Sequence, residues 1–428
     1  MIVIHKLEDL KPEQILNRDL RAEQSVEDVV DGIIADVRAR GDVALKEYAL
    51  KFDKADIQNL QVTAAEIEDA FANMDEYYLE TLRQAAANIE AFHKQQVHKD
   101  MVMQGAEGQT GVVLGQKYTP IEKAGVYVPG GTAAYPSTVL MDVIPAKVAG
   151  VHEIVMVTPA GKDGSVNPVI LAAAATAGVT KIFKTGGAQA IAALAYGTES
   201  IPAVDKIVGP GNIYVATAKR KVFGKVGIDM IAGPSEILVL ADGSCNPAWV
   251  AADLLSQAEH DVLASAVLVT DDAALATAVQ AELEVQIPLL PRAEIARASI
   301  DTNGKIIVCQ NIKDAIAVSN QIAPEHLEVC LDDPFGVLPE ITNAGSIFLG
   351  KHVPEALGDY FAGPNHTLPT SGTARFSSPL GVDDFVKKSS FIYYTKDALA
   401  AVQPRITDFA EREGLFAHGK SVSIRFEK

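Results

Sequence analysis

The stretch KIFKTGGAQAIAALAYG, residues 181–197, decides the fold. It begins with a short apolar segment, turns at Gly186-Gly187 and continues as an alanine-rich segment with helical spacing. A strand that ends in a glycine turn and leads directly into a helix is half of a βαβ unit, and such units build parallel sheets. The stretch therefore predicts an α/β fold.

The same alternation continues on both sides of this stretch. Strand-like and helix-like segments follow one another, with short turns, from about Ile121 to Gly224. The pattern restarts after Gly233-Pro234 and ends near Gly350. Two of the helices begin with an Asn-Pro pair, at Asn167 and Asn246, which suits the N-cap and first helical positions. The sequence thus predicts two α/β blocks of similar design.

Composition limits the classes of function. The 428 residues are too many for one simple core, and contents of 48% hydrophobic and 21% charged residues are typical of a soluble globular protein. A net charge of −18 disfavours nucleic acid as a partner. No segment is apolar enough to cross a membrane or to act as a signal peptide. Three widely spaced cysteines argue against disulfides, so we expect a cytoplasmic protein.

Three glycine turns each follow a predicted strand and precede a predicted helix, at Gly130-Gly131, Gly186-Gly187 and Gly209-Pro210-Gly211. Ligands of doubly wound sheets bind beyond the carboxyl ends of strands, where glycines let backbone amides approach a phosphate. Three such turns in one block favour a nucleotide or phosphate ligand. Any one of these turns is better explained by tight turn geometry alone, and no G-x-G-x-x-G fingerprint is present.

Polar and ionisable residues gather around four of the nine histidines: His260 near Gln257, His326 beside Glu325, His366 after Asp359, and His418 near Glu413. Gln257 and His260 stand three residues apart on a predicted helix, which makes them neighbours on one face. Imidazole, carboxylate and amide oxygen together suit a zinc-like ion. Their spacing matches no local metal motif such as H-E-x-x-H, so a structural or exposed role is the simpler interpretation of each histidine taken alone.

The adjacent Glu325 and His326 admit two interpretations. Two titratable neighbours can act as separate bases if their environments differ. Alternatively, Pro324 begins a helix with an acid in its first turn, a favourable placement in the helix dipole. Both interpretations can hold together. Cys245, a possible nucleophile for aldehyde oxidation, has no nearby histidine in the sequence and is expected to be a bystander.

Eight segments of the chain together resemble the histidinol dehydrogenase family. They are VYVPGG…YPSTVLM (126–141), TGGAQAIAALAYGT (185–198), KIVGPGN (206–212), IAGPSEILVLAD (231–242), DLLSQAEHD (253–261), NQIAPEHLE (320–328), GDYFAGPNHTLPT (358–370) and EGLFAH (413–418). Each is a weak signal alone, but their joint occurrence in order along essentially the whole chain is specific.

The resemblance implies a zinc-dependent, two-step oxidation of L-histidinol to L-histidine through histidinaldehyde, with reduction of two NAD, as the last step of histidine biosynthesis. It implies one Zn²⁺ per subunit and a homodimer whose active site is shared between subunits. The implied zinc ligands, which also contact substrate, are Gln257, His260, Asp359 and His418. The implied acid–base pair is Glu325 and His326. Further substrate contacts are His326, Ser235, His366 and Glu413, and the implied NAD contacts are Tyr127, Gln189 and Asn212.

The implied architecture is two similar incomplete Rossmann-like domains with a short N-terminal arm and a small C-terminal tail domain. We expect the arm at 1–23, a discontinuous domain with the zinc and catalytic residues at 24–126 and 236–380, and the NAD-binding domain at 127–235. Residues 381–428 are expected to form a tail that reaches the partner subunit. From its sequence this tail looks like an appendage, with a helix near 396–413, rather than a third sheet.

Two other functions fit the pattern of residues. A zinc ion with an adjacent glutamate could activate water in a hydrolase, although the glycine turns suggest a cofactor that hydrolysis does not need. Two α/β blocks could also form a two-lobed binding protein for a small polar ligand, although such proteins are typically exported. Saturable NAD binding counts against the first, and conversion of ligand in the presence of NAD counts against the second.

Overall fold

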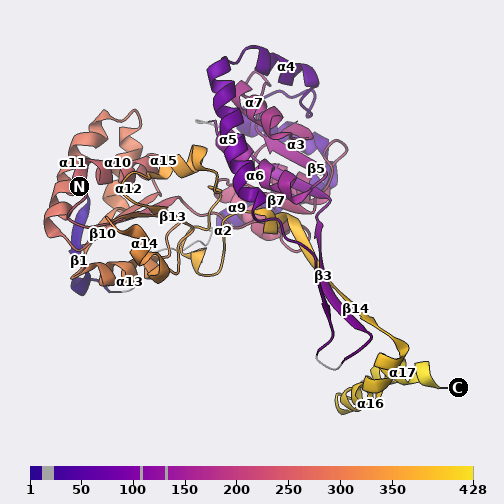
Figure 1. The fold of residues 1–428 in the computed structure, drawn as a ribbon. Helices are drawn as coiled ribbons and strands as arrows, with labels where there is room; N and C mark the ends of the chain where they lie inside the picture. Colours follow the sequence, from indigo (N-terminus) through magenta and orange to yellow (C-terminus); the bar gives the residue numbers. More distant parts are fainter. Residues whose placement is uncertain (12–23, 107–108, 131–133, 428) are drawn as a thin grey trace. The chain divides into compact units, whose positions relative to one another are not determined.

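In the computed structural model, which describes residues 1–11, 24–106, 109–130 and 134–427, the chain divides into two units (Figure 1). Unit 1 joins Met1–Gln96 to Ile121–Phe385, and unit 2 joins Val97–Pro120 to Val386–Lys428. Unit 1 contains two parallel sheets, and unit 2 contains one antiparallel sheet. The prediction of an α/β protein with two Rossmann-like blocks is confirmed.

The first sheet of unit 1 has the strand order β6-β5-β4-β7-β8, and every pair is parallel. Numbered along the chain, this is the order 3-2-1-4-5 of a Rossmann-type sheet that lacks its last strand. Its strands are β4 (Lys123–Tyr127), β5 (Glu153–Thr158), β6 (Lys181–Lys184), β7 (Lys206–Val208) and β8 (Gly227–Ile228).

Helices cover both faces of the first sheet. Val155 and Val157 of β5 join one buried cluster, whereas Ile154 and Met156 join the other, as expected when successive side chains of a strand point to opposite faces. The first cluster includes residues of α2 (Gln24–Arg40), α3 (Asp42–Tyr48), α8 (Gly187–Tyr196) and α9 (Ile213–Val222). The second includes residues of α4 (Ala64–Ala72), α5 (Glu76–Lys94), α6 (Pro136–Ala149) and α7 (Pro168–Ala177).

The second sheet repeats this order and extends it by one strand, β1-β11-β10-β9-β12-β13, again all parallel. Its strands are β1 (Val3–Lys6), β9 (Glu236–Ala241), β10 (Ser265–Thr270), β11 (Lys305–Val308), β12 (His326–Cys330) and β13 (Ser346–Leu349). The accompanying helices are α10 (Pro247–Ala258), α11 (Ala273–Gln286), α12 (Ala293–Thr302), α13 (Ile312–Ile322), α14 (Pro334–Val337) and α15 (Glu355–Leu357). The N-terminal arm thus contributes an edge strand, while most of it, 12–23, lies outside the described residues.

Residues 24–96 pack on the first sheet, whereas the predicted domain boundaries grouped them with 236–380. Val30 and Ile33 of α2 lie in the cluster that contains Ile191 of α8. The apolar stripe of an amphipathic helix shows that it covers a surface, but it does not show which sheet provides that surface.

Unit 2 is a three-stranded antiparallel sheet followed by two helices. The strand order is β14-β3-β2, with Val386 opposite Pro120 and Tyr394 opposite Val112. The elements are β2 (Met101–Gln104), β3 (Val112–Pro120), β14 (Val386–Tyr394), α16 (Lys396–Arg412) and α17 (Phe416–Ser423). The helix expected near 396–413 is present, but the tail does form a third sheet, because it pairs with a segment that lies far earlier in the chain.

The two Asn-Pro helix starts are confirmed. The side chain of Asn167 accepts a hydrogen bond from the amide of Val169 at 3.1 Å, and Asn246 does the same for Ala248 at 2.9 Å. Each side chain satisfies one of the amides that a helix start leaves without a partner. Among the helices of the described residues, none combines the length and apolar character that crossing a membrane requires.

Candidate active site

The predicted acid–base pair lies at the amino end of strand β12, beside the amino end of its parallel neighbour β9. Glu325 immediately precedes β12, which begins at His326, and His326 is in register with Ile237 of β9. Both side chains are buried, with exposed fractions of 7% and 4%. The site therefore lies at the amino ends of the strands of the second sheet. Doubly wound sheets usually bind ligands at the opposite, carboxyl ends.

The helix start proposed for Pro324 is wrong. Helix α13 ends at Ile322, and Ala323 adopts a left-handed conformation with φ of 50°. The chain then enters β12, so Glu325 and His326 belong to a strand start. A short apolar segment such as HLEVC does not distinguish a buried strand from a helix by its periodicity.

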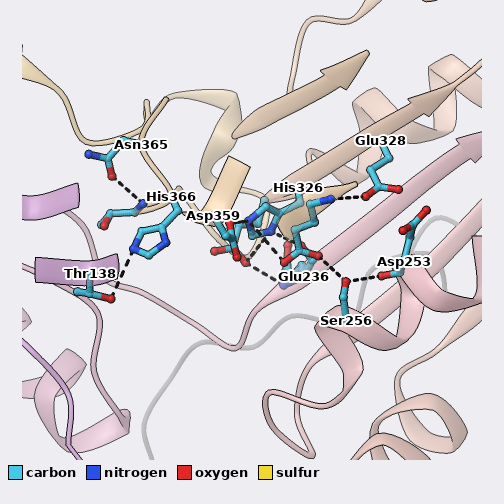
Figure 2. Close-up of polar contacts among 12 residues, drawn as sticks. Thr138, Glu236, Asp253, Ser256, His326, Glu328, Asp359, Asn365 and His366 are labelled. Carbon is cyan, nitrogen blue, oxygen red and sulfur yellow. Dashed lines mark hydrogen bonds and ion pairs between the residues drawn. The ribbon is translucent and has the colours of Figure 1, made fainter. Parts of the chain in front are cut away.

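The imidazole of His326 is held between a backbone carbonyl and two carboxylates. Its Nδ1 lies 3.0 Å from the carbonyl oxygen of Glu236, while Nε2 lies 3.5 Å from Oδ1 of Asp359 and 3.8 Å from Oε1 of Glu355. Figure 2 shows His326 and Asp359 pointing toward one another. Burial alone would lower the pKa of His326, but the charges of Glu355 and Glu325 raise it well above its usual range.

The backbone of Glu236 fixes Glu325 as well. The Glu236 amide donates a hydrogen bond to Oε2 of Glu325 at 2.8 Å, and the same carboxylate oxygen lies 3.7 Å from Nδ1 of His326. Burial raises the pKa of Glu325 to about 8, although the nearby imidazole opposes this shift. One residue of β9 thus orients both members of the pair through its N–H and C=O groups.

Glu355 is a central residue that the sequence analysis missed. It is 2% exposed, and its Oε2 accepts a hydrogen bond from the hydroxyl of Ser256 at 3.1 Å. With its amide nitrogen turned toward this carboxylate, Gln257 donates to the same oxygen at 3.0 Å. Burial raises the pKa of Glu355 to about 7. The sequence did contain a signal for Glu355. It stands four residues before Asp359, and that spacing brings two side chains together on a helical turn.

Three predicted zinc ligands of unit 1 surround this cluster. Gln257 is 1% exposed and contacts Glu355, as described above. Nδ1 of His260 is buried and has no hydrogen-bond partner among the described residues. Burial would raise the pKa of Asp359, but the hydrogen bond and charge of His326 lower it, with smaller contributions from His366 and His260. A buried imidazole nitrogen without a hydrogen-bond partner, a carboxylate and an amide are the kinds of nitrogen and oxygen donors that zinc takes.

A second set of donors in the same place includes the predicted base. Donor atoms of His326, Glu355 and Asp359 lie within 4.8 Å of one another. Asp359 therefore belongs both to this set and to the predicted one. Beyond the shared Asp359, the predicted set has Gln257, His260 and His418, whereas the second set has His326 and Glu355.

The other predicted substrate residues of unit 1 lie at the borders of the cluster. Ser235 directly precedes Glu236, and its carbonyl accepts a hydrogen bond from the amide of Ser265 at 3.0 Å. His366 is partly buried, and its Nε2 lies 3.5 Å from the hydroxyl oxygen of Thr138 on α6 (Figure 2). His366 therefore links the second sheet's side of the site to the first block.

The two predicted residues of the tail belong to unit 2. Glu413 follows the last residue of α16, and His418 lies on α17. Both side chains are exposed. Their roles as substrate contact and zinc ligand stay predictions.

The predicted NAD contacts lie where strands of the first sheet end and helices begin. The hydroxyl of Tyr127, at the end of β4, accepts a hydrogen bond from the amide of Gly187 at 3.0 Å. Gln189 is buried in the first turn of α8. Asn212 is exposed and caps α9, accepting hydrogen bonds from the amides of Tyr214 and Val215. The glycine turns after β4 and β6 come together, since a Cβ on Gly130 or Gly186 would meet Pro159.

Cys245 is not placed as a nucleophile. Its thiol is buried, lies 2.8 Å from the carbonyl oxygen of Cys330, and has a pKa that burial raises to about 11. A thiol with a raised pKa is a poor nucleophile at neutral pH. This agrees with the interpretation of Cys245 as a bystander.

Comparison with known proteins gives one consistent family. A family model described as histidinol dehydrogenase matches residues 16–426. Histidinol dehydrogenase of Syntrophotalea carbinolica is 58% identical over 406 residues, which cover 94% of this chain and 93% of that protein. The enzyme of Listeria monocytogenes serotype 4b is 55% identical over 422 residues, covering 99% and 97%. The crystal structure of histidinol dehydrogenase from Elizabethkingia anophelis has a TM-score of 0.94 at 40% identity and covers 99% of this chain and 98% of that chain.

Proposed function

The chain belongs to the histidinol dehydrogenase family, and we propose that it oxidises L-histidinol to L-histidine through histidinaldehyde, with zinc and two molecules of NAD. The conversion of a primary alcohol to a carboxylate removes two hydrides and adds one oxygen from water. It therefore requires a base that acts twice and a group that activates water. The buried pair of Glu325 and His326 carries the proposal, since it supplies two proton acceptors side by side.

His326 is assigned to the proton of the alcohol. Its Nδ1 faces the Glu236 carbonyl and holds a hydrogen, so Nε2 is the nitrogen that gains and loses a proton. The carboxylates that raise the pKa of His326 favour uptake of a proton at Nε2 once the ring is neutral. Nε2 takes the hydroxyl proton as the carbon's hydride leaves for NAD. After release of that proton, it takes another when the hydrated aldehyde loses its second hydride.

Glu325 is assigned to the water. The amide of Glu236 holds the carboxyl group in place at 2.8 Å. As a carboxylate it removes a proton from water while the water oxygen bonds to the aldehyde carbon, giving the hydrate that is oxidised next. The pKa of about 8 produced by burial suits a group that must gain and lose a proton near neutral pH.

Zinc is proposed to bind Gln257, His260 and Asp359 together with His418. When bound, it would orient the substrate through its imidazole and amino nitrogens and polarise the reacting oxygen. This set leaves Nε2 of His326 available for proton transfer, whereas the alternative set of His326, Glu355 and Asp359 would occupy that nitrogen. Ser235, His366 and Glu413 are proposed to hold the rest of the substrate.

NAD is proposed to bind at Tyr127, Gln189 and Asn212. Support comes from their positions at the carboxyl ends of parallel strands, the usual cofactor edge of this fold. Asn212 caps the start of α9, the positive end of the helix dipole, which is a favourable place for a pyrophosphate.

A homodimer is proposed to complete each site with His418 and Glu413 of the partner subunit. Unit 2 exposes large apolar side chains, including Ile392 at 74%, Phe409 at 69% and Phe416 at 70%. Exposed apolar patches of this kind mark interaction surfaces. The setting is proposed to be the cytoplasm, as the last step of histidine biosynthesis.

The decisive experiment mixes the purified protein with zinc, NAD and L-histidinol and follows NADH by absorbance. A yield of about two NADH per histidinol, with L-histidine as product, is expected from the electron balance. Production of one NADH per histidinol, with accumulation of the aldehyde, would show that the protein does not catalyse the second oxidation. No NADH from zinc-loaded protein would overturn the proposal as a whole.

A further inference from the structure

A buried ionic cluster lies under the glycine turn that precedes Asn212. Nζ of Lys219 pairs with Oδ1 of Asp229, and these side chains are only 2% and 1% exposed. Lys219 also donates to the carbonyl oxygen of Gly209 at 2.8 Å, and the amide of Gly209 donates to Oδ2 of Asp229 at 2.8 Å. Both backbone groups of Gly209 are therefore held by charged side chains.

Asp142 of α6 lies against the same glycine. A Cβ on Gly209 would lie 3.0 Å from Oδ2 of Asp142 and 2.2 Å from the carbonyl oxygen of Tyr127, and the φ of Gly209 is 111°. Asp142 is fully buried, and its Oδ2 has no hydrogen-bond partner among the described residues. Only glycine fits between this carboxyl group and the strand end.

The other oxygen of Asp142 holds the loop that contains His366. Oδ1 accepts a hydrogen bond from the hydroxyl of Thr367 at 2.8 Å. Two further contacts join the loop to α6: Asn365 donates to the carbonyl of Met141 at 2.6 Å, and His366 approaches Thr138 at 3.5 Å. Because residues three and four apart share one face of a helix, the loop rests on a single face of α6.

From these contacts we infer that Asp142 is a positioning residue that fixes the His366 loop and the Gly209–Asn212 turn relative to one another. The inference rests on the proposed function, in which His366 contacts histidinol and Asn212 contacts NAD. Hydride transfer needs both reactants at a set distance and angle, and a misplacement of about 1 Å can cost about a hundredfold in rate. One side chain that touches both segments supplies this constraint.

The charge of the cluster agrees with such a role. Burial, and next the negative charge of Asp229, raises the pKa of Asp142 to about 8. A neutral Asp142 leaves Lys219 and Asp229 as a balanced pair, so the region holds no uncompensated buried charge. Asparagine is then the closest mimic of Asp142, because it keeps its shape and the acceptor oxygen for Thr367.

The test compares four variants by kcat and by the Michaelis constants for both reactants. Asp142→Ala is expected to lower kcat and to raise KM for NAD and KM for L-histidinol, each by about tenfold, the size of one lost buried hydrogen bond. Asp142→Asn is expected to stay within about threefold of wild type. Thr367→Val, which affects only the loop, is expected to raise KM for L-histidinol alone. Thr176→Val is the matched control, since its hydroxyl bonds only Ala172 within its own helix.

Several results would overturn the inference. The first is an Asp142→Ala enzyme in which only one KM changes, or only kcat. The second is an Asp142→Asn enzyme that is as impaired as Asp142→Ala. The third is a Thr367→Val enzyme with an unaltered KM for L-histidinol. If Asp142→Ala does not fold, Thr367→Val still tests the inference. Amide hydrogen exchange separates this inference from the proposed function, since faster exchange in both 209–215 and 365–370 of Asp142→Ala is expected even if wild type reduces no NAD.

Discussion

Nδ1 of His326 lies 3.0 Å from the backbone carbonyl oxygen of Glu236. A backbone acceptor cannot be changed by substitution, so the ring keeps its orientation whatever side chain stands at position 236. The opposite nitrogen, Nε2, then faces Asp359 at 3.5 Å. The protonation state of His326 is thus set by carboxylates on one side and by a strand on the other.

Replacement of His326 by asparagine tests its role as the base. His326→Asn should lower kcat by about 10² to 10⁴, the usual contribution of a positioned proton acceptor, while the zinc content stays that of wild type. Steady-state kinetics and metal analysis on the same preparation measure both. His152→Asn, an exposed histidine, serves as the control. Loss of zinc from His326→Asn would instead favour the set of His326, Glu355 and Asp359 as ligands.

For two other histidines, the zinc assignment predicts that substitution removes the zinc. His260→Ala and His418→Ala should each reduce bound zinc well below one per chain after dialysis, because structural and catalytic zinc sites depend on every protein ligand. Metal analysis measures the loss, and circular dichroism checks that the fold is kept. Full zinc occupancy in either variant would remove that residue from the ligand set.

Mixing inactive variants tests the shared active site. If His260 and His418 of each site come from different chains, a heterodimer of His260→Ala and His418→Ala contains one intact site and one doubly altered site. Random exchange of subunits makes about half of the dimers heterodimers, so about a quarter of wild-type activity should return. Activity is measured after mixing and reassociation. A mixture as inactive as its parts would place both histidines in one chain.

Asp142 should make stability depend on pH. Its folded-state pKa, raised by burial to about 8, exceeds that of the unfolded chain, 3.8. Between these values the folded protein binds a proton that the unfolded chain does not, so stability falls as pH rises from about 4 to about 8. Asp142→Asn should therefore gain thermal stability relative to wild type between pH 5 and pH 8, measured as the difference in Tm. Asp163→Asn, on the surface with a lowered pKa, should show a flat difference over this range. A flat difference for Asp142→Asn would contradict a raised pKa.

The cap of α10 should matter for stability because this helix carries Gln257, and His260 lies in the turn that follows its end at Ala258. Asn246→Ala removes the acceptor for the amide of Ala248 and should cost about 1 kcal/mol of unfolding free energy. Asn246→Asp keeps an acceptor and should cost much less. Denaturant unfolding of the three proteins gives the comparison, and equal stability of the alanine and aspartate variants would show that the cap contributes nothing.

The sequence predicted local features of the fold better than its long-range contacts. Alternating apolar segments predicted the two blocks, and the Asn-Pro pairs predicted the starts of α7 and α10, because both signals are local. β12 was missed, since five buried residues have no distinctive period. The placement of α2 and α5 on the first sheet was also missed, because their contacts join residues far apart in the chain.

The active site divides in the same way. Resemblance to the family named Gln257, His260, Glu325, His326 and Asp359. In the structure His326 lies close to Glu325 and to Asp359, and Gln257 contacts Glu355 of the same cluster, while the roles of all five stay predictions. Glu355 was not foreseen, although it contacts His326 and Gln257. Glu236 was missed for another reason: its backbone does the positioning, and backbone groups leave no trace in the residue type.

Unit 2 has a consequence for synthesis of the chain. Strand β3 leaves the ribosome long before its partner β14, with the whole of Ile121–Phe385 made in between. Until then, one edge of β3 has unpaired backbone groups, and such edges recruit strands of other molecules. Strand β1 is likewise synthesised long before its partner β11. A nascent chain thus carries two unfinished edges, one in each unit, and a truncation before Val386 leaves the first of them permanently open.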